Sequence, residues 1–372
     1  MNKHCKSNIQ IKIFQPLRYK KKEFQLNKLN ETMGCEFQYA SMGRYAIIHI
    51  LRSLDIVDGK ILISAYICPT VVEALIEYGY SVDYYDIDTE DLNPNMADVE
   101  KMVINVHPRA IVVPSMYGNP ANLIKAEEIG KKYSIAIIDD AAQSFGAKLE
   151  GRYLSTFGDG GMFSFSPGKA TSGSMGAFFC SKNPNYMIMR TKHVMKHYLQ
   201  YLDFKWNRYN IYSNPFYKVT RYIFLMKKFF RGDILNDDYC KFEVFMFGGV
   251  LEANSKAING FRRKYMDDFV ARFNDYPFFR IVKPLRGENN PHKIVLIFHD
   301  LKNATAFRRY MENMNVYTYG GYDLPLNSRD LPNLRNIVGK VVELPIEDNQ
   351  QRMEYIFQCV ENFNCYIEGE LK

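Results

Sequence analysis

A single lysine, Lys169, lies in a loop of small residues between two apolar runs of the chain. The stretch from Phe163 to Gly176 reads FSFSPGKATSGSMG, and the apolar run AFFCS follows it. An amine at that position could form a Schiff base with a carbonyl group. The glycines and serines around it would let the loop backbone approach a ligand closely. A lysine in such a loop is more often simply solvated, so Lys169 alone predicts no function.

Polar side chains follow a second apolar run, IAIIDD, which leads into AAQS. Asp139, Asp140 and Gln143 therefore stand at the end of an expected buried strand. Ser164 stands at the end of another such run, shortly before Lys169. Paired aspartates after a strand are also typical of a helix cap or a surface turn. These groups indicate chemistry only if they converge.

An anion site is expected where Gly43 and Arg44 begin a helix in SMGRYAIIHIL, residues 41–51. A helix start with a glycine offers free N–H groups and the positive end of the helix dipole, and a guanidinium strengthens phosphate binding. Most such helix starts bind nothing. Together, however, these groups are what pyridoxal 5'-phosphate requires. An amine forms the Schiff base, a carboxylate contacts the pyridine nitrogen, and a cradle anchors the phosphate.

Short apolar runs alternate with helical patterns between about residue 43 and residue 182. This alternation predicts a mainly parallel sheet sandwiched by helices, and such sheets bind ligands at the carboxyl ends of their strands. Strands are expected at 60–67, 81–88, 110–117, 135–140, 161–166 and 176–181, and helices at 69–79 and 120–133.

The chain changes character after residue 182. A large α/β domain is expected over 1–245, with a helical excursion at about 185–240, and a smaller C-terminal α+β domain over 246–372. The later expected elements are helices at 248–273, 304–315 and 354–363 and a strand at 292–300. The basic and aromatic segment NPFYKVTRYIFLMKKFFRG (214–232) could contact a membrane surface, but a helix packed over the active site or a dimer interface is favoured.

Composition limits the classes of function. The 372 residues are 47% hydrophobic and carry a net charge of +7, which is ordinary for a mildly basic globular enzyme. Lysines and arginines are dispersed, so we expect no nucleic-acid partner. The seven cysteines form no CxxC pair, and no signal peptide or long apolar run is evident, so a cytoplasmic location is expected.

A metal site is not expected. His193 and His197 have the spacing of a ligand pair on a helix, but no third ligand lies nearby in the sequence. These two side chains are therefore expected on a helix surface.

Longer runs around these motifs resemble the nucleotide-sugar aminotransferases of the DegT type. They are VVPSMYGNPANLIKAEEIGKKYSIAIIDDAAQSFGA (112–147) and GDGGMFSFSPGKATSGSMGAFF (158–179), supported by ISAYICPTVVEALIEYGYSVDYYDID (63–88) and LPNLRNIVGKVVELPI (331–346). DDAAQS followed by SFSPGK at this separation is specific, whereas either alone is only suggestive. The resemblance implies the fold type I architecture of pyridoxal phosphate enzymes.

The resemblance also implies a role for four of the residues described above. Lys169 would be the Schiff-base lysine, and Asp140 would contact the pyridine nitrogen of the cofactor. Gln143 would hydrogen-bond the phenolic oxygen of the cofactor, and Ser164 would contact its phosphate.

Other positions are assigned less uniquely by the resemblance. Gly43 and Arg44 would complete the phosphate cradle, although many relatives have Thr or Ser where Arg44 stands. The aromatic side chain that covers the cofactor would be Tyr66, although Cys68 is the closest aligned position. Asn236 is a loose candidate for an asparagine that relatives supply from the partner subunit.

The reaction implied by the resemblance is transfer of an amino group from glutamate to a keto group of a nucleotide-linked (deoxy)sugar. It would serve the synthesis of amino sugars for a surface polysaccharide such as O-antigen, in a homodimer with shared active sites. The dehydratase branch of the family has histidine in place of the lysine, so Lys169 favours amino transfer. A sugar dehydratase, another fold type I enzyme and a catalytically silent scaffold subunit remain as alternatives.

Overall fold

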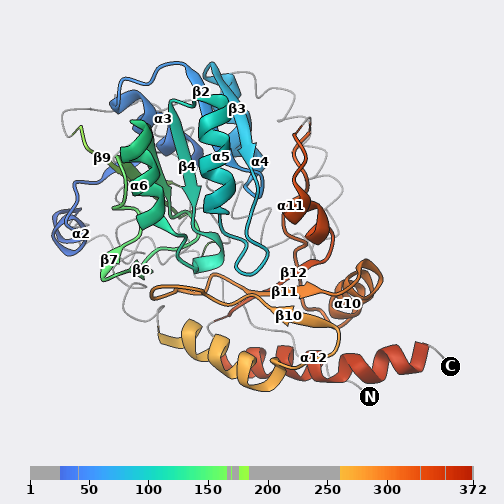
Figure 1. Cartoon of the computed structure of the whole chain (residues 1–372). Coiled ribbons are helices and arrows are strands. Elements are labelled where there is room, and N and C mark those ends of the chain that lie inside the picture. The colour runs from blue at the N-terminus through green and yellow to red at the C-terminus, as the bar shows by residue number, and fades with distance from the viewer. Residues whose placement is uncertain are drawn as a thin grey trace, which may run out of the picture.

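The computed structural model describes residues 26–40, 42–165, 169, 176–183, 260–326, 328–347 and 349–370 (Figure 1). The expectations for the segment 185–240, the boundary between 245 and 246, His193, His197 and Asn236 lie outside these residues.

A seven-stranded sheet forms the centre of the larger part of the described chain. Its strands are β1 (Gln38–Ala40), β2 (Gly59–Ser64), β3 (Tyr80–Tyr85), β4 (Ala110–Pro114), β5 (Ala136–Asp140), β8 (Gly160–Ser164) and β9 (Ala177–Ser181). They lie in the order β1-β9-β8-β5-β4-β2-β3. From β3 to β8 each neighbouring pair of strands is parallel, whereas β9 is antiparallel to both of its neighbours, β8 and β1. The expected mainly parallel sheet is confirmed.

Helices cover both faces of this sheet. They are α2 (Leu26–Met33), α3 (Gly43–Ser53), α4 (Pro69–Glu77), α5 (Met96–Val106) and α6 (Leu123–Tyr133). Successive residues of a strand point to opposite faces, so Ile111 and Val113 of β4 pack in one apolar cluster with α5 and α6. Ala110 and Val112 pack in another with α3 and α4. Burial on both faces explains why these strands are continuously apolar.

Asparagine side chains set where two of these helices begin. Asn95 accepts hydrogen bonds from the backbone N–H groups of Ala97 and Asp98 at the start of α5. Asn122 accepts one from Lys125, so α6 begins at Leu123, later than the expected 120. Each cap satisfies N–H groups that have no partner within the helix.

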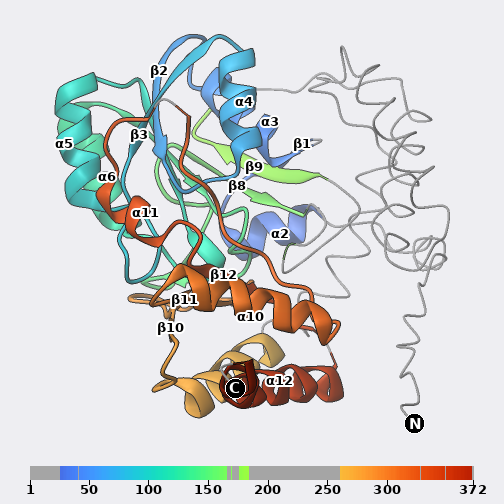
Figure 2. The ribbon, with the colours of Figure 1, turned by 90° about the vertical axis from the view of Figure 1, so that its right-hand side faces the viewer.

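The C-terminal part of the chain contains a second, antiparallel sheet (Figure 2). Its strands are β10 (Phe279–Ile281), β11 (Ile294–Phe298) and β12 (Val341–Leu344), in that order. Its helices are α10 (Leu301–Asn313), α11 (Pro332–Ile337), α12 (Gln350–Glu370) and the helical residues 260–273. An aromatic-rich core joins this sheet to α10 and α12. Strands and helices are thus combined here as the sequence predicts, while the position of the domain boundary stays a prediction.

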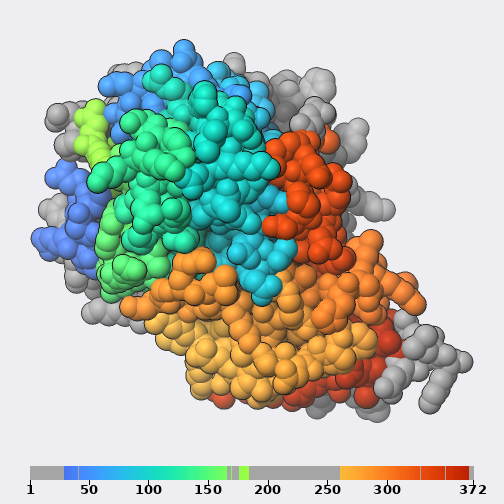
Figure 3. Space-filling view, in the orientation of Figure 1, coloured from blue at the N-terminus to red at the C-terminus, as the bar shows by residue number. Residues whose placement is uncertain are grey.

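The C-terminal part of the chain contacts the part that contains the large sheet over a wide area. The segment that includes α11 lies against that part (Figure 3). A short hairpin of β6 (Lys148–Leu149) and β7 (Arg152–Tyr153) also faces the C-terminal part, through a bridge from Lys148 to Glu288. Among the described residues, no helix combines the length and the apolar character needed to cross a membrane.

Candidate active site

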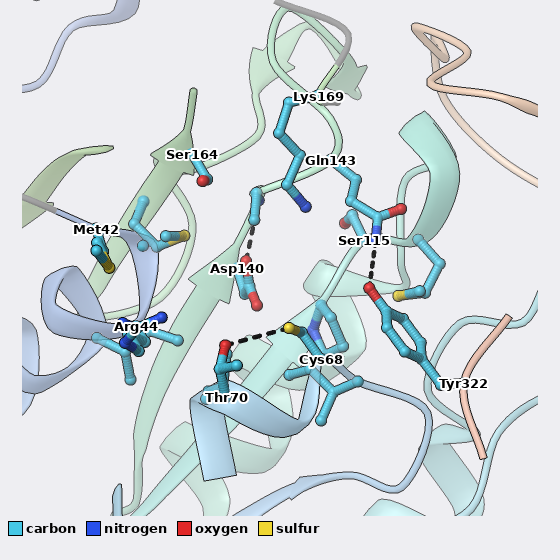
Figure 4. A pocket seen from close by; sticks show the side chains of 18 residues that line it. Met42, Arg44, Cys68, Thr70, Ser115, Asp140, Gln143, Ser164, Lys169 and Tyr322 are labelled. Atoms are coloured by element: carbon cyan, nitrogen blue, oxygen red, sulfur yellow. Dashed lines mark hydrogen bonds between the residues drawn. The ribbon is translucent and has the colours of Figure 1, made fainter. Parts of the chain in front are cut away.

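A pocket of about 270 Å³ opens at the carboxyl ends of β4, β5 and β8, beside the first turn of α3 (Figure 4). It is lined by six of the residues that the sequence singled out, namely Gly43, Arg44, Asp140, Gln143, Ser164 and Lys169. Met42, Cys68, Thr70, Ser115 and Tyr322 also contribute to its wall. Segments far apart in the sequence therefore converge on one cavity.

Lys169 extends its amine into the pocket, between Ser164 on one side and Gln143 on the other (Figure 4). Burial lowers the pKa of the Lys169 ammonium, and the negative charge of Asp140 acts in the opposite direction. A lowered pKa increases the neutral fraction of the amine near pH 7. The neutral form is the one that attacks a carbonyl carbon.

The two adjacent aspartates have different surroundings. Asp140 is the last residue of β5 and lines the pocket, where its Oδ1 accepts the backbone N–H of Ala142 at 2.9 Å. Asp139 points to the other face, where its Oδ2 accepts the N–H of Ser155 at 2.5 Å. Burial raises the pKa of both carboxyls, and for Asp140 the Ala142 N–H and the charge of Lys169 offset part of that rise. Of the two, Asp140 is therefore the one placed to meet a ligand.

The start of α3 approaches the end of β8 closely. A Cβ atom added to Gly43 would lie 2.6 Å from Cε of Met162 and 3.2 Å from Cβ of Ser164, so only glycine fits without a shift. The N-cap residue Met42 has an extended backbone, and no side-chain hydrogen bond caps the helix. The first turn of an uncapped helix directs N–H groups and a positive partial charge toward the pocket.

Arg44 adds a cation to this wall of the pocket. Its guanidinium lies over the ring of Tyr45, with Cζ 5.0 Å from the ring centroid. Both the helix start and this side chain therefore favour a negatively charged group in the pocket.

Tyr66 does not line the pocket, in contrast to the role expected for it. The side chain is 1% exposed, and its hydroxyl lies 2.7 Å from that of Tyr117. Cys68 lines the wall instead and contacts the hydroxyl of Thr70. Among the described residues, Tyr322 is the aromatic side chain that lines the pocket, and its ring meets that of Tyr66 edge-on at 5.2 Å. No local sequence signal marks Tyr322, because it reaches the site from the C-terminal part of the chain.

Gln143 is held between two tyrosines. Its Oε1 accepts the backbone N–H of Tyr117 at 3.0 Å, and its Nε2 donates to the hydroxyl of Tyr322 at 3.3 Å. Within the described residues there is no group of three or more side chains suited to hold a metal ion.

Comparison with known proteins identifies the region that carries this pocket. Residues 37–198 match the DegT/DnrJ/EryC1/StrS aminotransferase family. The chain is 31% identical over 132 residues to GDP-perosamine synthase of Escherichia coli O157:H7, which is 34% of this chain and 36% of that protein. It is 30% identical over 138 residues to UDP-N-acetyl-3-dehydro-alpha-D-glucosamine 3-aminotransferase of Acidithiobacillus ferrooxidans, which is 37% of this chain and 36% of that protein. The matches thus span about a third of the length of these relatives.

Solved structures share the fold over most of the chain. The aminotransferase TlmJ from Streptoalloteichus hindustanus superimposes with a TM-score of 0.72 at 15% identity, over 92% of this chain and 90% of that one. Helicobacter pylori PseC, an aminotransferase of pseudoaminic acid biosynthesis, gives a TM-score of 0.71 at 16% identity, over 92% and 91%. These likenesses establish the α/β fold of such aminotransferases. Over residues 37–198, the sequence of this chain is therefore similar to that of the DegT/DnrJ/EryC1/StrS aminotransferase family.

Proposed function

We propose that this protein is a pyridoxal 5'-phosphate-dependent aminotransferase that acts on a keto group of a nucleotide-linked sugar. The observation that carries the proposal is the meeting of Lys169, Asp140 and the start of α3 in one pocket. The match of residues 37–198 to an aminotransferase family supports it. The names of the related perosamine synthase and 3-aminotransferase support a sugar nucleotide as the acceptor.

The residues of the pocket fit this cofactor. A pyridoxal ring needs a neutral amine at its aldehyde carbon, a carboxylate at its ring nitrogen and a cradle for its phosphate. Burial favours the neutral amine of Lys169, and the buried carboxyl of Asp140 faces the same cavity. The uncapped start of α3, the missing side chain at Gly43 and the hydroxyl of Ser164 together form an anion cradle.

Each residue would have a separate task in the reaction. Lys169 would hold the cofactor through its amine. Once displaced by the amino donor, Lys169 would take the proton from the substrate carbon that bears the amino group and deliver it to the aldehyde carbon of the cofactor. Asp140 would keep the ring nitrogen protonated, and Gln143 would donate a hydrogen bond to the phenolic oxygen. The first turn of α3, with Arg44, would bind the phosphate. When bound, the cofactor supplies an electron sink for charge that develops on the substrate carbon.

The finer assignments are part of the same proposal. Glutamate would donate the amino group, and a keto-deoxysugar nucleotide would accept it for the synthesis of a surface polysaccharide such as O-antigen. The protein would work in the cytoplasm as a homodimer. A lysine at position 169 supports amino transfer over dehydration, because the resemblance implies a histidine there in dehydratases.

The test is removal of the amine at position 169. The protein with pyridoxal phosphate should gain a visible absorption band that glutamate abolishes, and Lys169→Ala should lack this band and all amino transfer. Lys125→Ala removes an exposed lysine of α6 that pairs with Glu128, and it should retain both properties. A visible band that persists in Lys169→Ala would refute the lysine assignment. Loss of oxygen from a keto sugar, without amino transfer, would instead identify a dehydratase.

A further inference from the structure

The side-chain amide of Gln143 has one orientation, which the protein imposes from outside the pocket. The backbone N–H of Tyr117 lies 3.0 Å from one end of this amide. A backbone N–H can only donate, so the atom that meets it is the amide oxygen. The NH₂ group of Gln143 must then face the pocket and Tyr322.

The backbone of Tyr117 has an unfavourable conformation at the residue that makes this contact. Its φ is 56° and its ψ is 19°, in the left-handed region that residues with a Cβ atom rarely adopt. The carbonyl of Tyr117 accepts the N–H of His292 at 2.8 Å, and the next residue, Gly118, accepts the N–H of Asn290 at 3.0 Å. The C-terminal part of the chain thus holds this turn on its carbonyl side.

The side chain of Tyr117 is held by a chain of hydroxyl groups that ends on a carboxylate. The hydroxyl of Tyr117 donates to Oε1 of Glu343 in β12 at 2.8 Å. Because that proton is used, the Tyr117 oxygen accepts from the hydroxyl of Tyr66 at 2.7 Å. Oε2 of Glu343 lies 3.2 Å from the ammonium of Lys293. Each group in the chain therefore has a partner of the right kind.

Burial keeps the two tyrosine hydroxyls of this chain protonated. The Tyr66 and Tyr117 side chains are 1% and 2% exposed, and burial raises the pKa of both hydroxyls well above the usual value for tyrosine. Both hydroxyls therefore keep their protons at neutral pH and continue to donate.

We propose that Tyr117 and Glu343 are positioning residues for Gln143. Glu343 holds the hydroxyl of Tyr117, the fixed Tyr117 keeps its N–H on the amide oxygen, and the NH₂ group is thereby aimed at a ligand oxygen in the pocket. This inference rests on the proposed function, in which that oxygen is the phenolic oxygen of the cofactor. A residue of the small C-terminal sheet, Glu343, then controls the hydrogen bond that is made by Gln143, which follows β5 of the large sheet.

The first measurement uses the protein without cofactor. The side-chain amide resonance of Gln143 is followed by NMR in isotope-labelled protein and is assigned by its loss in Gln143→Leu. Tyr117→Phe should move this resonance and speed the exchange of its protons with solvent. The paired variant Glu343→Leu with Lys293→Met should do the same, because it removes the acceptor without leaving an unpaired charge. An unchanged resonance in both variants would overturn the proposal.

A matched control removes another ion pair of the C-terminal part. Glu347 and Arg352 lie 3.4 Å apart and belong to no part of the hydroxyl chain. Glu347→Leu with Arg352→Met should leave the Gln143 resonance unchanged. If this control moved the resonance as far as the Glu343 pair did, the effect would be a general loosening, and the proposal would fail. If Tyr117→Phe does not fold, the Glu343 pair decides the question by itself.

The second measurement uses the protein loaded with pyridoxal phosphate. A donor on the phenolic oxygen favours its ionised form, so its loss should raise the pH midpoint of the visible band in Tyr117→Phe. The loss should also lower kcat roughly tenfold, with KM within about twofold of the wild type, as for a hydrogen bond to a charged group. A lower Tm with an unmoved midpoint would mean a purely structural role. Failure of the wild-type protein to bind the cofactor would defeat the proposed function, while the amide resonance would still decide the positioning.

Discussion

Among the single side chains, the two aspartates at the end of β5 differ because the strand turns them to opposite faces. Asp140 meets the pocket and the charge of Lys169, whereas Asp139 meets the backbone of the loop at residues 155–157. Asp140 is thus placed to contact a ligand, whereas Asp139 accepts backbone hydrogen bonds within the folded chain. Their substitutions should have different effects.

Asp140→Asn should retain binding of pyridoxal phosphate and lose most turnover. The amide keeps the shape of the carboxyl group and can still accept the N–H of Ala142, but it has no charge to hold a ring nitrogen protonated. We expect kcat to fall by about a hundredfold or more, the usual effect of removing one electrostatic contact in an active site. Steady-state amino transfer measures this, and rates near those of the wild type would refute the role of Asp140.

Asp139→Asn should change how stability depends on pH. Burial raises the pKa of Asp139 from 3.8 to about 8. Between these values the folded chain holds a proton that the unfolded chain has lost, so the free energy of unfolding falls as pH rises through this window and levels off above it. Asparagine does not titrate, so the fall in Tm from pH 4 to pH 8 should be smaller in the variant. Parallel curves of Tm against pH for the two proteins would contradict this expectation.

Among the elements, the short helical turn Met116–Gly118 after β4 joins the pocket to the C-terminal sheet. Gly118 has a φ of 89°, and its carbonyl accepts the N–H of Asn290. A Cβ atom at Gly118 would lie 1.8 Å from the carbonyl oxygen of Asn290, which is a clash with backbone. This glycine is required by close approach as well as by its left-handed conformation.

Gly118→Ala should therefore destabilise the protein by more than about 3 kcal/mol, since both strain and overpacking oppose it. Gly34→Ala is the matched control, because Gly34 has a φ of 67° but nothing within 4 Å of the added carbon. Gly34→Ala should lower the free energy of unfolding by about 1–2 kcal/mol, which is the cost of the left-handed backbone conformation alone. Equilibrium unfolding in urea gives both values. Equal losses for the two variants would show that the contact with Asn290 contributes nothing.

At the scale of the whole molecule, the large sheet caps a helix of the C-terminal part. The helix α11 has no side-chain cap of its own at Leu331. Asp86, which follows β3, accepts the N–H groups of Asn333 at 2.8 Å and Leu334 at 3.0 Å. This is the region where the two parts of the chain meet in Figure 3. A cap from across the molecule links the position of α11 to that of β3.

Asp86→Ala should lower the free energy of unfolding by about 1–2 kcal/mol, the usual cost of a lost N-cap. Asp88→Ala is the control, because Asp88 accepts a side-chain hydrogen bond from the nearby N–H of Glu90 and not from α11. It should cost less than about 0.5 kcal/mol, as for a surface substitution. Denaturant titration compares the two variants, and equal losses would show that the cap contributes no stability.

Much of the large sheet could be predicted from the sequence because its strands are apolar on both faces. The run AIVVP of β4 is fully buried, and its composition alone separates it from the helices beside it. The three-residue β1 and the helix α5 were not predicted. β1 is too short to show a period, and its place is decided by pairing with β9 at the sheet edge.

The candidate site divides in the same way. Lys169, Asp140 and Ser164 could be singled out because each follows an apolar run, and parallel strands bring such positions to one edge. Tyr66 was assigned to the pocket, but the structure buries it beside Tyr117. Tyr322 carried no local signal, since it reaches Gln143 from 179 residues away.

The sequence by itself determined which segments become buried strands and which polar side chains follow them, because these properties depend on neighbours a few residues apart. Only the tertiary structure decided which aromatic side chain meets the pocket and which carboxylate holds Tyr117. Tyr117 and Glu343 are 226 positions apart, and their contact exists only where the two sheets pack together. The chemistry was therefore encoded locally, whereas its orientation depends on packing between distant parts of the chain.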